Sequence, residues 1–180
     1  MLAPTCHAAV FVLRCTQKLL GRLNATPDPE PTPTDTVLGD WYANLIRVGR
    51  SQVVLAVSER SLLPVVVPAR DGRSIASRLS EALGLILSAV GVPPDDAIAE
   101  RGAMQSWAIG KTVNRRVLGS LSDLAFQLEV GLRDSPDRTL LAQSLWLART
   151  PLKVIDYGAP DQATLAAFAA RRALRAASHR

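Results

Sequence analysis

The sequence predicts an α+β fold: a small antiparallel β-meander packed against several helices, with a helical C-terminal half. Short β-prone runs follow one another with tight links between residues 40 and 68. Apolar residues then recur at helical spacing from residue 75 onward. The chain has 180 residues, of which 48% are hydrophobic and 21% charged, so it is long and apolar enough to bury a core.

The first elements are a strand and a short helix. Residues 10–15 form a β-prone run, and Thr16 is expected to cap a helix that ends at Leu23. Residues 24–36 follow, with prolines at four alternate positions, 27, 29, 31 and 33. Because each proline fixes its own φ and extends its neighbour, this segment is interpreted as a semi-rigid connector within the domain.

Three strands are expected next, over residues 40–48, 52–57 and 62–67, and their short links predict an antiparallel meander. The middle run is continuously apolar, which predicts a strand covered on both faces. Pro64 cannot donate a backbone hydrogen bond, so the third strand is expected at an edge of the sheet or at a bulge.

The remaining chain predicts helices, placed over one face of the sheet. Their expected spans are 74–90, 95–107, 120–133, 140–148 and 161 onward. Ser74 and Ser120 are expected to cap the first and third of them.

Residues 10–160 are interpreted as a single α+β domain that contains the Pro-rich connector. Residues 1–9 are expected to be a disordered leader, and residues 161–180 a C-terminal helix with a basic tail. The longest nearly apolar run, residues 82–92, is too short for a transmembrane helix, and no signal-peptide pattern is present. A cytoplasmic protein with no membrane partner is therefore expected.

The net charge of +5 is unevenly distributed. The last ten residues hold four arginines and no acidic residue, and without them the chain has 17 basic against 16 acidic residues. This distribution gives little support to nucleic-acid binding by the whole domain. A solvated amphipathic tail is the favoured interpretation, and a nucleic-acid arm is the alternative.

Histidine and cysteine are scarce. The two histidines, His7 and His179, lie near the termini, which argues against a Ser-His-Asp or Cys-His centre in the body of the protein. Cys6 and Cys15 do not form a disulfide framework, and Cys15 is expected to be a buried residue. No catalytic residue, metal site or cofactor is predicted.

Residues 111–120 (KTVNRRVLGS) form the first candidate site, because they place three cations and an asparagine before an expected helix start at Ser120. Free backbone N–H groups and the positive end of the helix dipole attract anions there. The predicted ligand-binding residues of this segment are Lys111, Asn114, Arg115, Arg116 and Ser120. The alternative is structural: Arg115 pairs with a carboxylate such as Asp40 or Asp123, and Asn114 satisfies backbone groups of the loop.

The same segment imitates a phosphate-binding P-loop only at Gly110-Lys111-Thr112. The P-loop motif needs a glycine five residues before Gly110, where this chain has Gln105. It also needs a preceding strand, whereas a helix pattern precedes it. A P-loop is therefore rejected.

The second candidate cluster is Asp40-Trp41-Tyr42-Ala43-Asn44. On a strand, Trp41 and Tyr42 point to opposite faces, so they cannot form one stacking platform and packing is favoured. Asp40 and Asn44 complete the predicted ligand-binding set. The carboxylates of the chain are otherwise isolated, without a spacing typical of an acid–base pair.

Three segments, CTQKLL (15–20), LGDWYANL (38–45) and KTVNRRVLGS (111–120), together resemble a family of short bacterial proteins classed as a domain of unknown function. The resemblance covers about residues 10–164 and includes Thr150-Pro151-Leu152. The family implies no activity, cofactor or site residue. It implies that the leader before Val10 is peculiar to this chain.

Three classes of function follow. The first is a non-catalytic binding or regulatory module whose cationic loop binds an anionic small molecule, a nucleic acid or a partner protein. The second is a small enzyme that uses Asp40 as a base and Lys111 or Arg115 to stabilise charge. The third is a partner protein of a toxin–antitoxin or phage-defence operon. The binding module is preferred over the enzyme and over the operon partner.

Overall fold

The computed structural model describes residues 10–70 and 75–178. The expected leader (1–9), the Ser74 cap and both histidines lie outside these residues. Within the described residues, no helix combines the length and the apolarity needed to cross a bilayer.

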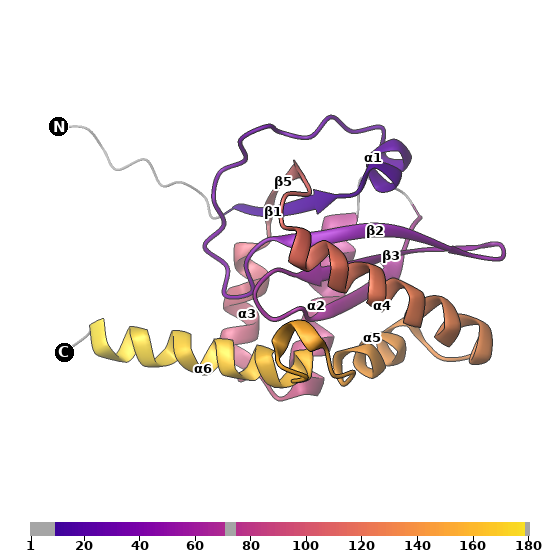
Figure 1. The fold of residues 1–180 in the computed structure, drawn as a ribbon. Coiled ribbons are helices and arrows are strands. Elements are labelled where there is room, and N and C mark those ends of the chain that lie inside the picture. The colour runs from indigo at the N-terminus through magenta and orange to yellow at the C-terminus, as the bar shows by residue number, and fades with distance from the viewer. Residues whose placement is uncertain (1–9, 71–74, 179–180) are drawn as a thin grey trace.

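A five-stranded mixed sheet forms the centre of the molecule, in the order β4-β3-β2-β1-β5 (Figure 1). The strands are β1 (Val10–Cys15), β2 (Trp41–Val48), β3 (Ser51–Ser58), β4 (Pro64–Pro68) and β5 (Ser106–Lys111). β2, β3 and β4 pair antiparallel, which confirms the predicted meander. β1 lies between β2 and β5 and runs parallel to both.

β5 corrects the prediction of a helix that extends to residue 107. The helix in question, α3 (Pro94–Ala103), ends earlier, and Ser106–Lys111 becomes a strand. The physical reason lies in β1, whose outer edge offers unpaired backbone groups along its whole length. All six residues of β5 pair with β1, from Val10↔Ser106 to Cys15↔Lys111. Tertiary pairing thus outweighs local helix preference.

The helices are α1 (Gln17–Leu23), α2 (Ile75–Val90), α3, α4 (Arg115–Asp134), α5 (Leu140–Ala148) and α6 (Pro160–Ser178), with a 3-10 turn at Lys153–Ile155. α5 has the expected bounds. α4 begins five residues before the predicted start at Ser120, and α6 begins one residue before Asp161.

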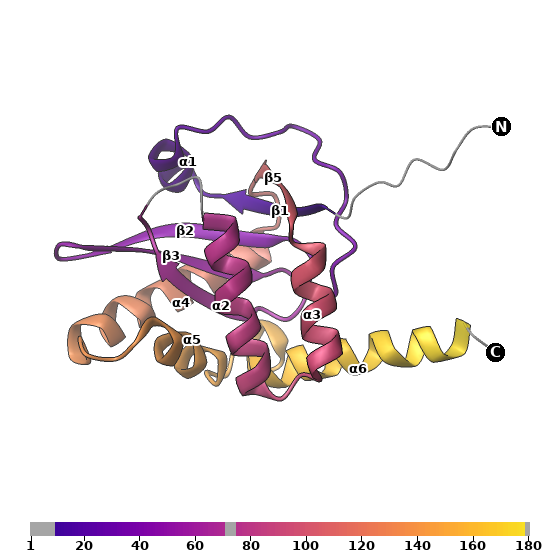
Figure 2. The same cartoon turned by 180° about the vertical axis from the view of Figure 1, so that it is seen from behind.

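Helices cover both faces of the sheet, which corrects the expectation that they cover one. The first core lies between one face and α1, α2 and α3, and it contains Trp41. The second lies between the other face and α4, and it contains Tyr42. Figures 1 and 2 show α4 and α2 on opposite sides of the strands. Both aromatic side chains are fully buried, so Trp41 and Tyr42 point to opposite faces, as predicted, and each packs in a core.

The middle strand and the edge strand also follow the prediction. Residues 53–57 of β3 are all buried, because the strand has helices on both sides. β4, which begins at Pro64, is an edge strand. Its edge is covered by α5, where the Ser144 hydroxyl accepts the Val66 N–H at 2.9 Å. That contact satisfies a backbone donor that would otherwise invite pairing with another chain.

The Pro-rich connector runs beside the opposite edge. The Asp28 N–H donates to the Ile109 carbonyl of β5 at 2.8 Å, at a single bridge between Asp28 and Gly110. The alternate prolines cannot continue such a ladder. The connector therefore shields β5 without adding a sixth strand.

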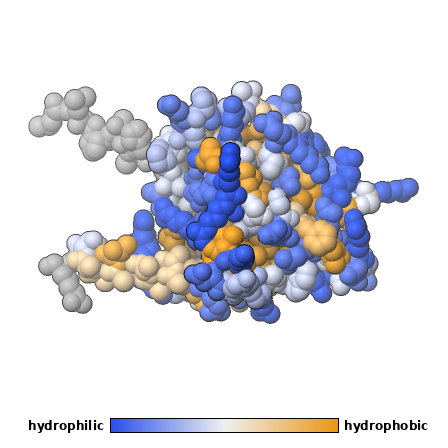
Figure 3. All heavy atoms as spheres, viewed as in Figure 1, coloured by the Kyte–Doolittle hydropathy of each residue, from blue (hydrophilic) through white to orange (hydrophobic). Residues whose placement is uncertain are grey.

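α6 buries side chains in the domain only along its first half. Thr164 and Phe168 are buried, whereas residues 172–178 are exposed. Figure 3 shows this outer part as a largely apolar projection from the body. Arg172 ties the helix to α3 through Asp96, at 2.6 Å. The structure thus has a helix over Pro160–Ser178, and the assignment of its outer half as an amphipathic basic tail stays a prediction.

The junction of α4 and α5 depends on a glycine. A Cβ added at Gly131 would lie 2.7 Å from Gln143 Oε1 and 3.0 Å from Trp146 Cζ3. Gln143 is fully buried and donates to the Gly131 carbonyl at 3.0 Å, so it cannot move aside.

Gly131→Ala is expected to lower the free energy of unfolding by about 1–3 kcal/mol, because the added methyl group overpacks this junction. Gly119→Ala is the matched control in the same helix, since nothing lies within 4 Å of its added Cβ. That variant should gain about 0.5–1 kcal/mol from helix propensity. Urea unfolding measures both, and equal effects of the two substitutions would contradict the packing described.

Candidate functional site

Polar side chains gather on the α4 face of the sheet, near the ends of β1 and β5. Arg14 lies opposite Tyr42 on β2 and opposite Gly110 on β5, so the three residues share this face. A Cβ added at Gly110 would lie 2.9 Å from Val12 Cγ1 and 3.3 Å from Arg14 Nη1. The glycine therefore leaves the room that the guanidinium occupies.

Arg14 forms the central ion pair of the site. Its Nε donates to Asp40 Oδ2 at 2.6 Å, and its Nη1 donates to the Lys111 carbonyl at 3.0 Å. Asp40 is 6% exposed. Burial raises the pKa of the Asp40 carboxyl above its ordinary value, although the hydrogen bond from Arg14 acts in the opposite direction. The carboxylate thus depends on Arg14 for its charge compensation.

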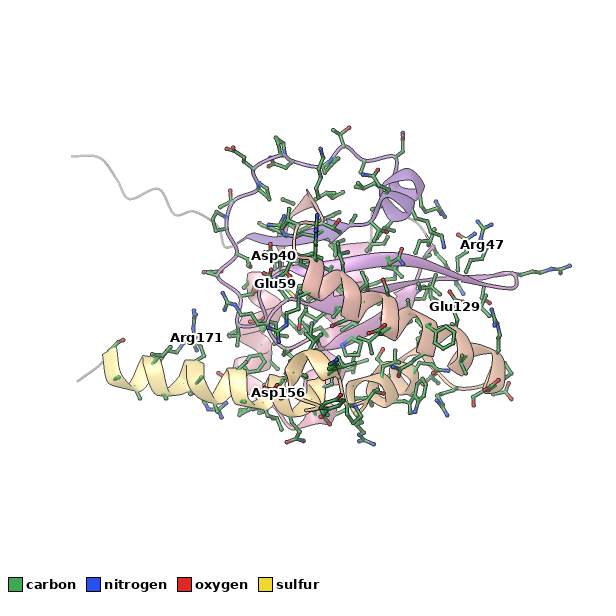
Figure 4. All side chains as sticks on the ribbon, in the orientation of Figure 1. Asp40, Arg47, Glu59, Glu129, Asp156 and Arg171 are labelled. Atoms are coloured by element: carbon green, nitrogen blue, oxygen red, sulfur yellow. The ribbon has the colours of Figure 1, made fainter. Side chains whose placement is uncertain are left out.

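Tyr42, Glu59 and Asn114 form the adjoining hydrogen-bond cluster. The Tyr42 hydroxyl donates to Glu59 Oε1 at 3.4 Å and accepts the Asn114 N–H at 3.2 Å. Asn114 Nδ2 donates to the same Glu59 oxygen at 3.3 Å. Figure 4 shows Asp40 and Glu59 next to each other close to the start of α4. We call these five residues (Arg14, Asp40, Tyr42, Glu59 and Asn114) the polar network.

Asn114 also sets the start of α4. Its Oδ1 accepts the N–H groups of Arg116 at 3.1 Å and Val117 at 3.4 Å, so Asn114 is the N-cap. This corrects the expectation that Ser120 caps the helix. Ser120 is buried in α4, and its hydroxyl donates to the Arg116 carbonyl at 3.4 Å. The free N–H groups expected beside Ser120 are therefore absent there.

Asn44 and Thr16 bind each other, and within the described residues neither side chain forms a hydrogen bond with a residue of the polar network. The Thr16 hydroxyl donates to Asn44 Oδ1 at 2.8 Å and makes no cap hydrogen bond to α1. Thr16 thus occupies the expected N-cap position, but it links α1 to β2 instead of capping. Asn44 is half-buried, with its side-chain oxygen engaged in this contact.

The three cations of the loop lie on the surface. We call residues 111–116 the cationic loop, in which Lys111, Arg115 and Arg116 are exposed. Within the described residues, none of them forms an ion pair. Arg116 donates to the Val154 carbonyl, which orients its guanidinium without neutralising it. Arg115 does not pair with Asp40 or Asp123, so the structural alternative for Arg115 is wrong.

A shallow groove adjoins the cationic loop at Lys111. It has a volume of about 400 Å³ and is otherwise lined by α1 and residues 24–27. The predicted site residues therefore divide into two groups. Asp40 and Asn114 belong to the polar network, whereas Lys111, Arg115 and Arg116 face solvent, and Asn44 and Ser120 join neither.

Sequence reasoning missed Arg14, Tyr42 and Glu59 as members of the site. Arg14 carried a usable signal, because a lone arginine inside the apolar strand run at residues 10–15 needs a carboxylate partner. Glu59 carried none, since a glutamate in a short turn is ordinary. One part of the argument against a P-loop is wrong, because a strand, β5, does precede the loop. The other part holds: residue 105 is Gln105 where the P-loop motif needs a glycine.

Cys15 is buried, as expected, and burial raises the pKa of its thiol to about 12. A thiol with this pKa is protonated at neutral pH. Among the residues that the structure describes, no group of three or more His, Cys, Asp or Glu side chains is placed to hold a metal ion.

Asn114→Ala is expected to lower the free energy of unfolding by about 1–2 kcal/mol, because it removes the α4 cap and the contact with Glu59. Asn114→Ser keeps a capping hydroxyl and should lose less than half of that amount. Urea unfolding at neutral pH measures both variants. Equal losses for serine and alanine would show that capping is not the main contribution.

The Asp40 carboxyl predicts a pH dependence. Its folded-state pKa is raised, so its contribution to stability is present below the unfolded-state pKa and lost as the pH rises through the folded-state pKa. Between about pH 3 and about pH 7, the wild type should therefore lose stability relative to Asp40→Asn. Urea unfolding of both proteins across this range is the measurement, and a relative gain by the wild type would contradict it.

Comparison with known proteins places the chain in a family. No curated protein and no solved structure matches it significantly. A family model described as "Domain of unknown function (DUF6933)" matches residues 12–163, which is most of the chain: the sheet except the first two residues of β1, helices α1 to α5, and only the start of α6. The resemblance to a domain of unknown function is thereby confirmed, and the chain belongs to the DUF6933 family.

Proposed function

We propose that this protein is a non-catalytic binding or regulatory module whose cationic loop binds an anionic ligand. The observation that carries this proposal is the lack of an ion pair for Lys111, Arg115 and Arg116 within the described residues. Three cations in a six-residue segment repel one another, and an anion relieves that repulsion.

The polar network contains two carboxylates, and within the described residues neither forms an ion pair with a cation of the loop. Asp40 accepts a hydrogen bond from Arg14, and Glu59 accepts hydrogen bonds from Tyr42 and Asn114. Arg14 compensates the charge of Asp40, whereas these partners of Glu59 are neutral and leave its charge in place. Asp40 and Asn114 act as positioning residues, since Arg14 fixes the Lys111 carbonyl and Asn114 fixes the first turn of α4.

The ligand contacts are assigned to the exposed cations. Lys111 lines the groove beside α1, so an anionic group at the mouth of that groove can reach its ammonium. Arg115 and Arg116 add planar donors suited to phosphate or carboxylate. Asn44 and Ser120, whose polar groups contact Thr16 and the Arg116 carbonyl, have no direct role in this proposal.

The enzyme alternative has weaker support. A base at Asp40 is consistent with the raised pKa of its carboxyl, a property that active-site acids often share. However, Arg14 occupies Asp40 Oδ2 and the residue is 6% exposed. A substrate would therefore have to displace Arg14 before Asp40 accepted a proton. The operon-partner and cytoplasmic assignments stay predictions from the sequence.

The test is a binding titration at low ionic strength with pyrophosphate and with a short oligothymidylate. Lys111→Ala/Arg115→Ala is expected to weaken binding by about tenfold or more, since each substitution removes a charge-assisted contact. Arg149→Ala, at an exposed arginine that ends α5, is the matched control and should bind as the wild type does.

Added salt should weaken wild-type binding more than that of the double variant, because screening acts on the charges that the variant lacks. Binding that the double variant leaves unchanged, or no binding of either probe by the wild type, would contradict the proposal.

A further inference from the structure

A second cationic region lies at the hairpin end of the sheet. A cleft of about 630 Å³ is bordered there by the β2–β3 turn, the end of β4, α1 and the loop between α4 and α5. Figures 1 and 2 both show these four segments on the same side of the molecule. No residue of the cationic loop lines this cleft, so the two regions are separate.

Among the described residues, four arginines line the cleft, one from each of four segments: Arg22, Arg50, Arg70 and Arg138. None of the described lining residues is acidic, and none of the four arginines forms an ion pair within the described residues. Four like charges around one cleft repel one another. A ligand with several negative charges would remove that repulsion and gain charge-assisted hydrogen bonds.

Two of the arginines are held in place by the fold. Arg22 Nη2 donates to the Ala69 carbonyl at 3.4 Å. Arg138 lies 5.3 Å above the Trp146 ring and donates to Gln143 Oε1 at 3.5 Å. The Arg138 guanidinium is thus oriented by neutral partners that leave its charge in place. Arg50 and Arg70 are exposed at the rim.

The floor of the cleft is apolar. Val53 and Ala69 are buried there, and Leu132 and Leu140 are half-buried. An inorganic anion would contact only the arginine rim and leave this floor in water. A ligand with an apolar or ring-shaped body attached to its charges would cover both.

We propose that this cleft binds a small organic polyphosphate about the size of a mononucleotide. Pockets for such molecules usually have volumes of about 300–1,000 Å³ and combine an apolar surface with a few convergent polar groups. The cleft has this size and this combination. The proposal does not depend on the cationic loop, because the two regions share no residue.

Calorimetric titrations at low ionic strength with metal-free adenosine triphosphate, inorganic tripolyphosphate and adenosine test the proposal. The triphosphate nucleotide should bind most tightly, tripolyphosphate at least about tenfold more weakly, and adenosine not detectably. Arg50→Ala/Arg70→Ala should weaken nucleotide binding by about tenfold or more. Both side chains are exposed, and circular dichroism checks the fold of the variant.

Arg149→Ala, at an exposed arginine outside both regions, is the matched control and should bind the nucleotide as the wild type does. Lys111→Ala/Arg115→Ala removes two cations of the loop, so the nucleotide binding that it retains should be weakened by about tenfold or more when Arg50→Ala/Arg70→Ala is added. Failure of the loop proposal and failure of the cleft proposal are therefore distinguishable. Nucleotide binding unaffected by Arg50→Ala/Arg70→Ala, or no nucleotide binding by the wild type, would overturn the proposal. If tripolyphosphate binds as tightly as the nucleotide, the apolar floor does not contribute to binding. The proposal of an organic ligand would then be wrong.

A second measurement needs no variant. Phenylglyoxal modifies accessible arginines, and mass spectrometry locates the modified sites. The nucleotide should protect Arg50 and Arg70 from modification while leaving Arg149 reactive. Equal modification of all three with and without nucleotide would contradict the assignment.

Discussion

The ion pair between Arg14 and Asp40 is the interaction on which the candidate site depends. One guanidinium joins three places in the fold: the end of β1, the residue before β2 and, through the Lys111 carbonyl, the end of β5. Well-buried ion pairs contribute little net stability, yet removing one partner commonly costs about 3–5 kcal/mol. Arg14 is partly exposed, so the loss of stability on removing Arg14 is expected to lie below that range. The pair therefore acts mainly by specifying geometry, because it fixes where β5 ends and where the cationic loop begins.

The pairing also takes Arg14 and Asp40 out of the charge balance of the surface. Asp40 and Glu59 lie beside each other at the start of α4, and each is engaged inside the polar network. Neither carboxylate reaches the exposed cations at residues 111–116. The cleft at the hairpin end also carries uncompensated positive charge, because the partners that orient Arg22 and Arg138 there are neutral. A nearly neutral body thus carries two separate cationic regions, which net charge alone does not reveal.

The sequence was a good guide where local pattern and tertiary structure agree. The apolar run at residues 53–57 is buried on both faces, Pro64 begins an edge strand, and the helix over residues 140–148 has its predicted bounds. It failed at residues 106–120, where β5 forms because β1 offers an edge and where Asn114, six residues before the expected cap Ser120, is the N-cap of α4. The sequence named Asp40, Asn114 and the exposed cations as candidates, but it did not place Arg14, Tyr42 or Glu59 beside them. Arg14 and Glu59 reach the site by strand register, which is a long-range property that local spacing does not encode.

The most direct test of this account is a pair of double-mutant cycles on stability. The first cycle combines Arg14→Ala with Asp40→Ala, and the second combines Arg115→Ala with Asp40→Ala. Contacting charges show coupling energies of about 0.5–3 kcal/mol, and distant ones add within about 0.3–0.5 kcal/mol. We expect coupling within the first range for Arg14 and additivity for Arg115. Strong coupling of Arg115 to Asp40, with additivity for Arg14, would mean that the loop is neutralised from within, and the anion-binding account would fail.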